Sequence, residues 1–145
     1  AFLSGLLHDC AKDSSGHCKT LIKGVRLSAE DRKIPAIWHN AAGKVLARQR
    51  YGIRSRAVLS AIAKHSTGSD KMSALDKAVY IADYIEPGRK FRSSRKILSM
   101  FRKGAGLDEL ALSVAMEKTG YLKMREMKIH GNTMAMIKSL KRRLK

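Results

Sequence analysis

The chain has 145 residues, of which 44% are hydrophobic and 29% charged, a composition that suits one globular domain and excludes a disordered segment. Its uncharged runs are far shorter than a membrane span, so we expect no membrane association. The formal net charge of +18 favours polyanionic partners such as nucleotides or nucleic acid, although a bias in composition explains it equally well.

Only two cysteines are present, Cys10 and Cys18. They are too few for a disulfide framework and indicate a reducing compartment, so we expect a cytoplasmic protein. The chain begins with Ala1, inside an apolar run that is typical of the middle of a buried helix. We therefore expect a single domain over residues 1–145 whose natural start lies upstream. Cys10 is expected to pack in the core, and Cys18 to lie in a loop.

Apolar residues recur at helical spacing along nearly the whole chain, which predicts an all-α fold. The first predicted helix carries an apolar stripe between residues 2 and 10, formed by Phe2, Leu3, Leu6, Leu7 and Cys10. A polar loop is expected at 12–19. Ser28 and Asp31 then form a predicted capping box for a short helix that Pro35 interrupts.

The middle of the chain contains three more predicted helices. The first carries apolar residues at 37–46 and ends at Gly52, and the second begins at Ser55 and ends near Gly68. A second capping box, formed by Ser73 and Asp76, opens the third. Its expected buried residues are Leu75, Val79 and Ala82.

The last third of the chain continues the helical pattern. A short helix is expected at 97–101, and a long amphipathic helix at 107–122. The final helix is expected to be lined by Met134, Ile137 and Leu140. No stretch shows the alternation of a β-strand.

Five polar residues do not fit the apolar pattern of a plain helical bundle: His8, Asp9, His39, His65 and Asp83. Asp83 lies in the apolar run AVYIADYI, where a carboxylate is costly unless it is paired or bound to a metal. Each residue alone has an ordinary explanation, as a core histidine or a helix cap. Together they form a set of nitrogen and oxygen ligands that suits iron, manganese, nickel or zinc with open coordination positions.

Four stretches resemble one known group, the YqeK-like family of HD-domain metal-dependent phosphohydrolases. They are GLLHDCAKD at 5–13, IPAIWHNAAGKVLARQRYGI at 34–53, AIAKHSTGSDKMSALDKAVYIADYIEPGR at 61–89, and the weaker KIHGNT at 128–133. The resemblance implies an all-α HD-domain helical bundle whose N-terminal helix is not in this sequence. It also implies symmetrical hydrolysis of diadenosine tetraphosphate and related dinucleoside polyphosphates to two ADP, by water that a metal activates for attack on phosphorus.

The resemblance also implies a set of metal ligands. His8, Asp9 and Asp83 match the ligands of a first metal, and a further histidine ligand of the family lies on a helix that precedes this chain. His39 and His65 match either the ligands of a second metal or groups that contact phosphate. The implied cofactor is iron, as one or two ions, with manganese, nickel or zinc as alternatives.

Further roles follow from the same resemblance. Lys12 and Arg89 resemble the phosphate-binding cations of the family, and Ser66 replaces a threonine that is common there. The residues with implied catalytic roles are Asp9, Lys12, His39 and His65. The residues with implied substrate contacts are Asp9, Cys10, Ala11, Lys12, His39, His65, Ser66, Asp83, Arg89 and His130.

Two other classes of function are consistent with the sequence. A catalytically degenerate HD domain would bind a nucleotide or a protein partner without turnover, and absence of the upstream histidine would favour it. A basic nucleic-acid-binding helical module would explain the charge, but only 6% of residues are aromatic and no basic-aromatic pattern is present. The sequence does not decide the oligomeric state, and a homodimer stays open.

Overall fold

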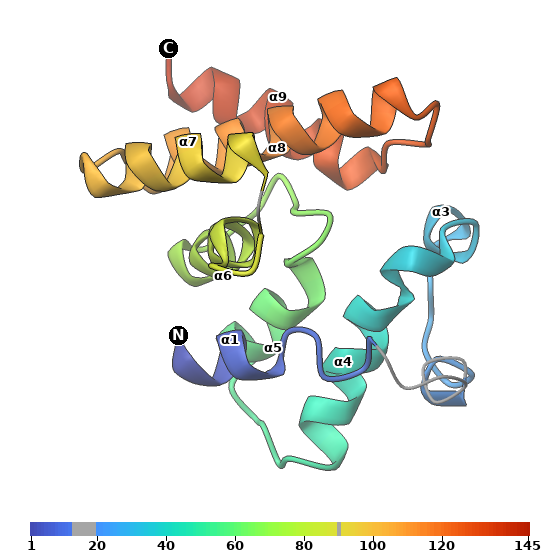
Figure 1. The fold of residues 1–145 in the computed structure, drawn as a ribbon. Coiled ribbons are helices and arrows are strands. Elements are labelled where there is room, and N and C mark those ends of the chain that lie inside the picture. The colour runs from blue at the N-terminus through green and yellow to red at the C-terminus, as the bar shows by residue number, and fades with distance from the viewer. Residues whose placement is uncertain (13–19, 90) are drawn as a thin grey trace.

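The computed structural model describes residues 1–12, 20–89 and 91–145, and every regular element in these ranges is helical (Figure 1). The helices are α1 (Phe2–Leu7), α3 (Ala29–Arg32), the 3-10 helix η1 (Pro35–Ile37), α4 (Trp38–Gln49), α5 (Arg56–Lys64), α6 (Ala74–Ile85), α7 (Arg92–Arg102), α8 (Leu107–Met124) and α9 (Gly131–Arg143). The predicted all-α fold is confirmed. Most of the loop predicted at 12–19, with Cys18, lies outside the described residues.

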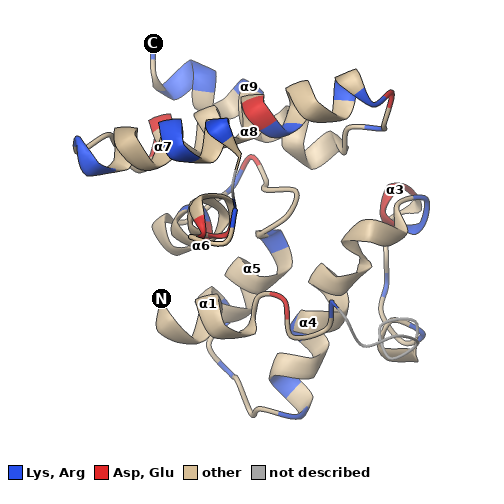
Figure 2. Cartoon of the chain, viewed as in Figure 1, with Lys and Arg blue, Asp and Glu red and all other residues tan. Residues whose placement is uncertain are grey.

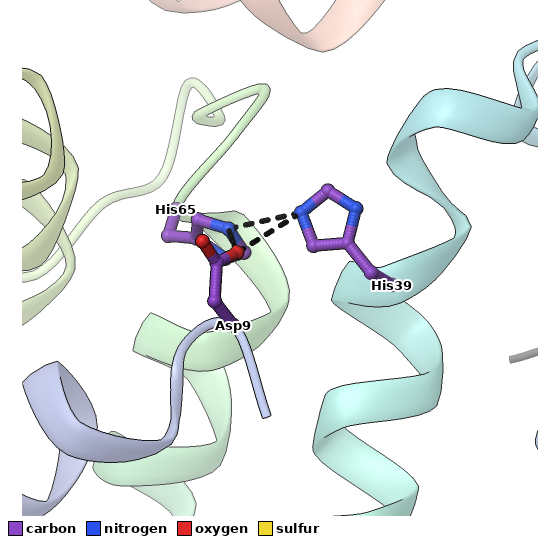
Figure 3. Close-up of side chains that lie close together, drawn as sticks. All are labelled: Asp9, His39 and His65. Atoms are coloured by element: carbon purple, nitrogen blue, oxygen red, sulfur yellow. Dashed lines mark hydrogen bonds and ion pairs between the residues drawn. The ribbon is translucent and has the colours of Figure 1, made fainter. Parts of the chain in front are cut away.

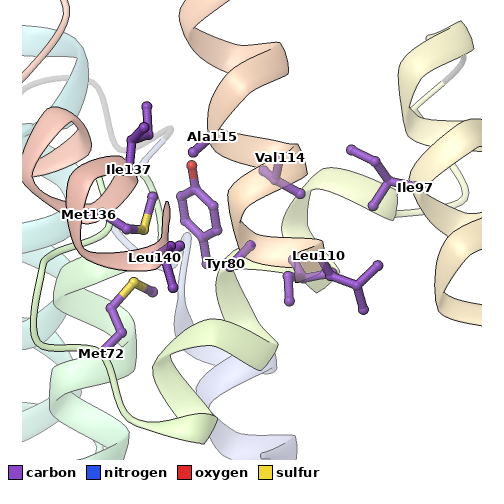
Figure 4. Close-up of a cluster of buried hydrophobic side chains, with 11 residues drawn as sticks. Met72, Tyr80, Ile97, Leu110, Val114, Ala115, Met136, Ile137 and Leu140 are labelled. Atoms are coloured by element: carbon purple, nitrogen blue, oxygen red, sulfur yellow. The ribbon is translucent and has the colours of Figure 1, made fainter. Parts of the chain in front are cut away.

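Helix α6 joins the two halves of the bundle, because it packs against α5 on one side and α8 on the other (Figure 1). The larger buried cluster lies among α6, α7, α8 and α9, and the fully buried ring of Tyr80 extends between side chains of α8 and α9, such as Val114 and Met136 (Figure 4). A smaller cluster, which includes Leu7 and Ile62, joins α1, α4 and α5. Cys10 packs against this smaller cluster, as predicted.

Three predicted helix starts are confirmed by their hydrogen bonds, whereas the short helix predicted at 97–101 is the longer α7, which begins at Arg92. Both capping boxes, Ser28 with Asp31 and Ser73 with Asp76, have the reciprocal bonds that satisfy the first free N–H groups of a helix. Ser55 Oγ likewise accepts a hydrogen bond from the backbone at the start of α5. These contacts are local, which is why the sequence alone predicts them.

The prediction that the apolar residues of α1 are buried is wrong for most of them. Helix α1 buries Ser4 and Leu7, whereas Phe2, Leu3 and Leu6 are exposed. A helix of six residues can turn one narrow face towards α5 and α6, and the other apolar side chains then point elsewhere.

Two further residues that were predicted to be buried are exposed. Met134 is 49% exposed, while Met136 is buried beside Ile137 and Leu140. The orientation of α9 against α8 selects the face that contains Met136. On α6, Ala82 is exposed because the buried face is formed by neighbours such as Tyr80.

Basic side chains are distributed over α4, α5, α7, α8 and α9 rather than gathered on one element (Figure 2). The net charge of +18 is therefore a property of the whole chain. Among the described residues, no helix is both long enough and apolar enough to cross a bilayer.

Gly68, the last residue of the KHSTG stretch, is expected to be intolerant of a side chain. Its φ is +67°, and a Cβ atom there would overlap the sulfur and terminal methyl of the buried Met136. We expect Gly68→Ala to lower the free energy of unfolding by about 2–4 kcal/mol, from left-handed backbone strain together with overpacking.

Urea denaturation followed by circular dichroism measures this change. Gly52→Ala is the matched control, because Gly52 has a φ of +65° but no atom lies within 4 Å of its would-be Cβ. The control should lose only the backbone part, about 1–2 kcal/mol. Equal losses in the two variants would contradict the steric argument.

Candidate metal centre

The five polar residues that the apolar pattern does not explain meet at one place in the fold. His8 is the C-cap of α1 and Asp9 follows it, whereas His39 lies in the first turn of α4. His65 is the C-cap of α5, and Asp83 lies in the last turn of α6. Helix α5 packs against α1, α4 and α6, and this packing brings the five side chains together.

Asp9, His39 and His65 form the more buried of two overlapping groups (Figure 3). Asp9 Oδ1 lies 3.5 Å from His39 Nε2 and 3.2 Å from His65 Nε2. The two nitrogens are 3.1 Å apart. Within the described residues, the buried Oδ1 of Asp9 receives no hydrogen bond of good geometry. Two ring nitrogens and one carboxylate oxygen therefore face one another at this point.

Backbone hydrogen bonds orient the histidine rings. His65 Nδ1 lies 2.8 Å from the carbonyl oxygen of Ile62, and His8 Nδ1 lies 2.6 Å from that of Gly5. Because a carbonyl oxygen only accepts, each Nδ1 carries a proton, and the Nε2 of the neutral ring presents a lone pair to the site. Metal-binding histidines are typically oriented in this way by their second nitrogen.

The second group contains His8, Asp9 and Asp83. His8 Nε2 lies 3.5 Å from Asp9 Oδ2 and 3.7 Å from Asp83 Oδ1. Asp9 therefore directs one carboxylate oxygen to each group. The nearby Asp83 carboxylate raises the pKa of His8, whereas partial burial of the ring lowers it.

The protonation states of His39, Asp9 and Asp83 suit a bound cation. Burial, foremost, lowers the pKa of His39 to about 4, so its ring is neutral at pH 7, the form that binds a metal. Burial alone would raise the pKa of Asp9, but contacts with His65 and Lys12 hold it well below its usual range. The pKa of Asp83 is likewise lowered, because His8 and neighbouring cations outweigh burial.

The donor set as a whole fits a divalent metal. Carboxylate oxygens and imidazole lone pairs crowd together at 3.1–3.7 Å, an arrangement that a cation between them stabilises. In each group, all ligand atoms lie within 4.8 Å of one another. Nitrogen and oxygen donors without a thiolate are the ligands of iron, manganese, nickel and zinc sites with open positions.

Three cations border the carboxylates. Lys12 Nζ lies 2.6 Å from Asp9 Oδ2. Around Asp83, Arg89 Nη2 lies 2.6 Å from Oδ1 and Lys118 Nζ lies 3.7 Å from Oδ2. Cations so close to the candidate ligands are well placed to bind the oxygens of a phosphate at the same centre.

A family match explains this arrangement. Residues 1–88, more than half of the chain, match the family described as HD domain. The chain belongs to the HD domain family. HD domains bind divalent metals, and the matched range contains all five residues of the two groups.

Individual relatives agree with this assignment. The symmetrical bis(5'-nucleosyl)-tetraphosphatase of Halalkalibacterium halodurans is 31% identical over 138 residues, covering 93% of this chain and 72% of that protein. The enzyme of the same name from Staphylococcus aureus is 29% identical over 133 residues, covering 90% and 69%. A crystal structure described as a predicted HD superfamily hydrolase involved in NAD metabolism, from Clostridium acetobutylicum, has a TM-score of 0.88 and 33% identity, covering 97% of this chain and 75% of that one. The predicted resemblance is confirmed, and this chain is an HD hydrolase.

Of the remaining residues predicted for the substrate site of the HD hydrolase, Ser66 lies at the metal centre. Its Oγ lies 3.0 Å from His65 Nε2 and 3.1 Å from His39 Nε2, and it donates a hydrogen bond to Asn40. Cys10 directs its sulfur to the carbonyl of Gly43, and Ala11 is fully buried. The substrate contacts predicted for these two residues stay predictions.

His130 lies at the N-cap of α9 and joins that helix to α3. Its Nδ1 accepts a hydrogen bond from the backbone of Asn132, so Nε2 carries a proton and donates to Asp31 Oδ1 at 2.9 Å. Both ring nitrogens are thus engaged within the protein. The substrate contact predicted for His130 stays a prediction.

Two polar residues of the HD hydrolase site were missed by the sequence analysis. Asn40 accepts the hydrogen bond of Ser66, and Lys118 approaches Asp83 from α8. Lys118 follows Val114 by one helical turn on a mostly apolar face, a signal that could have revealed it. Burial, foremost, lowers the pKa of Lys118 to about 8.

Proposed function

We propose that this HD hydrolase cleaves diadenosine tetraphosphate, and related dinucleoside polyphosphates, symmetrically into two ADP. The observation that carries the proposal is the convergence of carboxylate oxygens and oriented imidazole nitrogens next to three cations. The two relatives named as symmetrical tetraphosphatases support this substrate class.

A metal would be held by His8, Asp9 and Asp83, and His39 and His65 would hold a second ion or contact phosphate. Iron is the proposed metal because the family resemblance implies it; manganese, nickel and zinc also suit nitrogen and oxygen ligands and are the alternatives. A bound divalent cation supplies Lewis acidity and activates water at neutral pH. Asp9 belongs to both groups, so it would contribute to holding either ion.

The protein itself binds and orients the phosphate chain. Lys12 acts as a compact charge, whereas the planar guanidinium of Arg89 can grip two phosphate oxygens at once. Lys118 adds a third charge beside Asp83. These cations offset negative charge on the oxygens of the reacting phosphate groups.

The reaction is a hydrolysis at the central phosphate bridge. The oxygen of water bonds to one of the two phosphorus atoms that flank the central bridging oxygen. The bond from that phosphorus to the bridging oxygen breaks, and ADP leaves with the bridging oxygen. The attacked half then also becomes ADP.

Product analysis tests the proposal directly. The protein is loaded with ferrous iron without oxygen, incubated with diadenosine tetraphosphate and analysed by ion-exchange chromatography. ADP is the expected sole product. A chelator is expected to lower the rate by at least about a hundredfold, and added ferrous iron to restore it.

Other outcomes would lead to different conclusions. ATP and AMP as products would contradict symmetrical cleavage. Absence of turnover, with iron bound and helix content intact, would indicate a degenerate HD domain. RNA binding that weakens steeply with salt, again without hydrolysis, would favour a nucleic-acid-binding module.

A further inference from the structure

A cavity of about 560 Å³ lies between the end of α6, the start of α7 and the second half of α8. Three aromatic residues, Tyr84, Phe91 and Tyr121, and two cations, Arg89 and Lys118, contribute to its walls. Its volume falls within the range of roughly 300–1,000 Å³ that is typical of small-molecule sites.

The two cations connect this cavity with the metal centre. Arg89 Nη2 lies 2.6 Å from Asp83 Oδ1, and Lys118 Nζ lies 3.7 Å from Asp83 Oδ2. Both side chains also line the cavity. A phosphate group held by these cations would therefore stand between the candidate metal ligands and the cavity.

The aromatic walls offer faces for stacking. Phe91 and Tyr121 are 56% and 52% exposed and both line the cavity, so a ligand bound there would cover their rings. Tyr84 is held in place by a hydrogen bond of 2.7 Å between its hydroxyl and Ser93 Oγ. Arg125 lies 5.4 Å from the centre of the Tyr121 ring and adds a further cation beside the cavity.

We propose that this cavity binds one purine nucleoside of the dinucleotide substrate. The base stacks against Phe91 and Tyr121, and the phosphate chain passes Arg89 and Lys118 to reach the metal centre. The inference rests on the proposed function. The inference is based on how the side chains are arranged. The cations lie next to Asp83, and the aromatic rings line the cavity that the same cations border. A nucleotide has the matching arrangement, with its phosphates at one end and its base at the other.

Steady-state kinetics of the iron-loaded enzyme with diadenosine tetraphosphate test this assignment. We expect Phe91→Ala and Tyr121→Ala each to raise KM about tenfold with kcat within about twofold, because stacking on one aromatic side chain contributes at this level. Phe91→Tyr keeps an aromatic face and should behave like the wild type. Phe101→Ala is the matched control, since Phe101 lies in α7, the helix that Phe91 precedes as N-cap, is 54% exposed and does not line the cavity.

If the wild type hydrolyses the dinucleotide and Phe91→Ala has the same KM as Phe101→Ala, the assignment is wrong while the proposed function stands. If the wild type does not hydrolyse it, the proposed function fails, and equilibrium dialysis with ADP still tests the cavity. A dissociation constant about tenfold higher in Phe91→Ala than in Phe101→Ala then supports nucleoside binding. Equal constants overturn it.

Discussion

Replacing Asp9 by alanine is expected to abolish hydrolysis of diadenosine tetraphosphate while leaving the helix content unchanged. Asp9 has one oxygen near His39 and His65 and the other near His8, so the variant removes a donor from both groups. Loss of a residue that only supports a ligand typically costs 10–100-fold in affinity or activity. Loss of a shared ligand should exceed this, and we expect a fall in kcat on the order of 10³-fold or more.

Turnover and bound iron are both measured in this experiment, the iron by elemental analysis of the dialysed protein. Asp83→Ala and His8→Ala are expected to lose activity as well, because each removes a member of the second group. Asp70→Ala is the control, since Asp70 is exposed and lies outside both groups. Near-normal turnover and iron content in Asp9→Ala would contradict the proposed metal centre.

Replacing Asp76 by alanine is expected to lower the free energy of unfolding by about 2–4 kcal/mol. Asp76 is 1% exposed, and its Oδ2 accepts hydrogen bonds from Ser73 N at 2.8 Å and Lys64 Nζ at 3.0 Å. The variant removes the acceptor that Asp76 gives to the Ser73 backbone in the capping box, at a cost of about 1 kcal/mol, and leaves a partly buried ammonium without its carboxylate. Lys64 is 27% exposed and also donates to the Lys71 carbonyl, so the second cost falls below that of a fully buried pair.

The pH dependence of the same variant gives a second test. Burial opposes ionisation of Asp76, but hydrogen bonds from Ser73 and Lys64 lower its pKa below the ordinary value of 3.8. Its stabilisation is therefore present above the pKa of the unfolded chain and is lost as the pH falls through the folded-state pKa. Urea denaturation at several pH values should show the largest difference between wild type and Asp76→Ala near neutrality. Asp76→Asn, which keeps an acceptor for Ser73, should lose less.

The capping boxes, the helix order and the five unusual polar residues were all predictable from the sequence. Each depends on contacts within a few residues, as between Ser73 and Asp76, or on a polar residue that interrupts an apolar pattern, as at Asp83. The family resemblance added the expectation that these polar residues form one metal centre. The family match over residues 1–88 confirms the resemblance itself.

Other features depend on how the helices pack, and periodicity along one helix does not contain that information. The packing of α9 against α8 leaves Met136 buried and Met134 exposed, and the short α1 turns Leu7 rather than Leu6 inward. Long-range packing also brings Lys118 of α8 to Asp83 of α6 and opens the cavity beside them. Local sequence thus specifies the helices and their caps, whereas contacts between distant segments select the buried faces and assemble the surroundings of the metal centre.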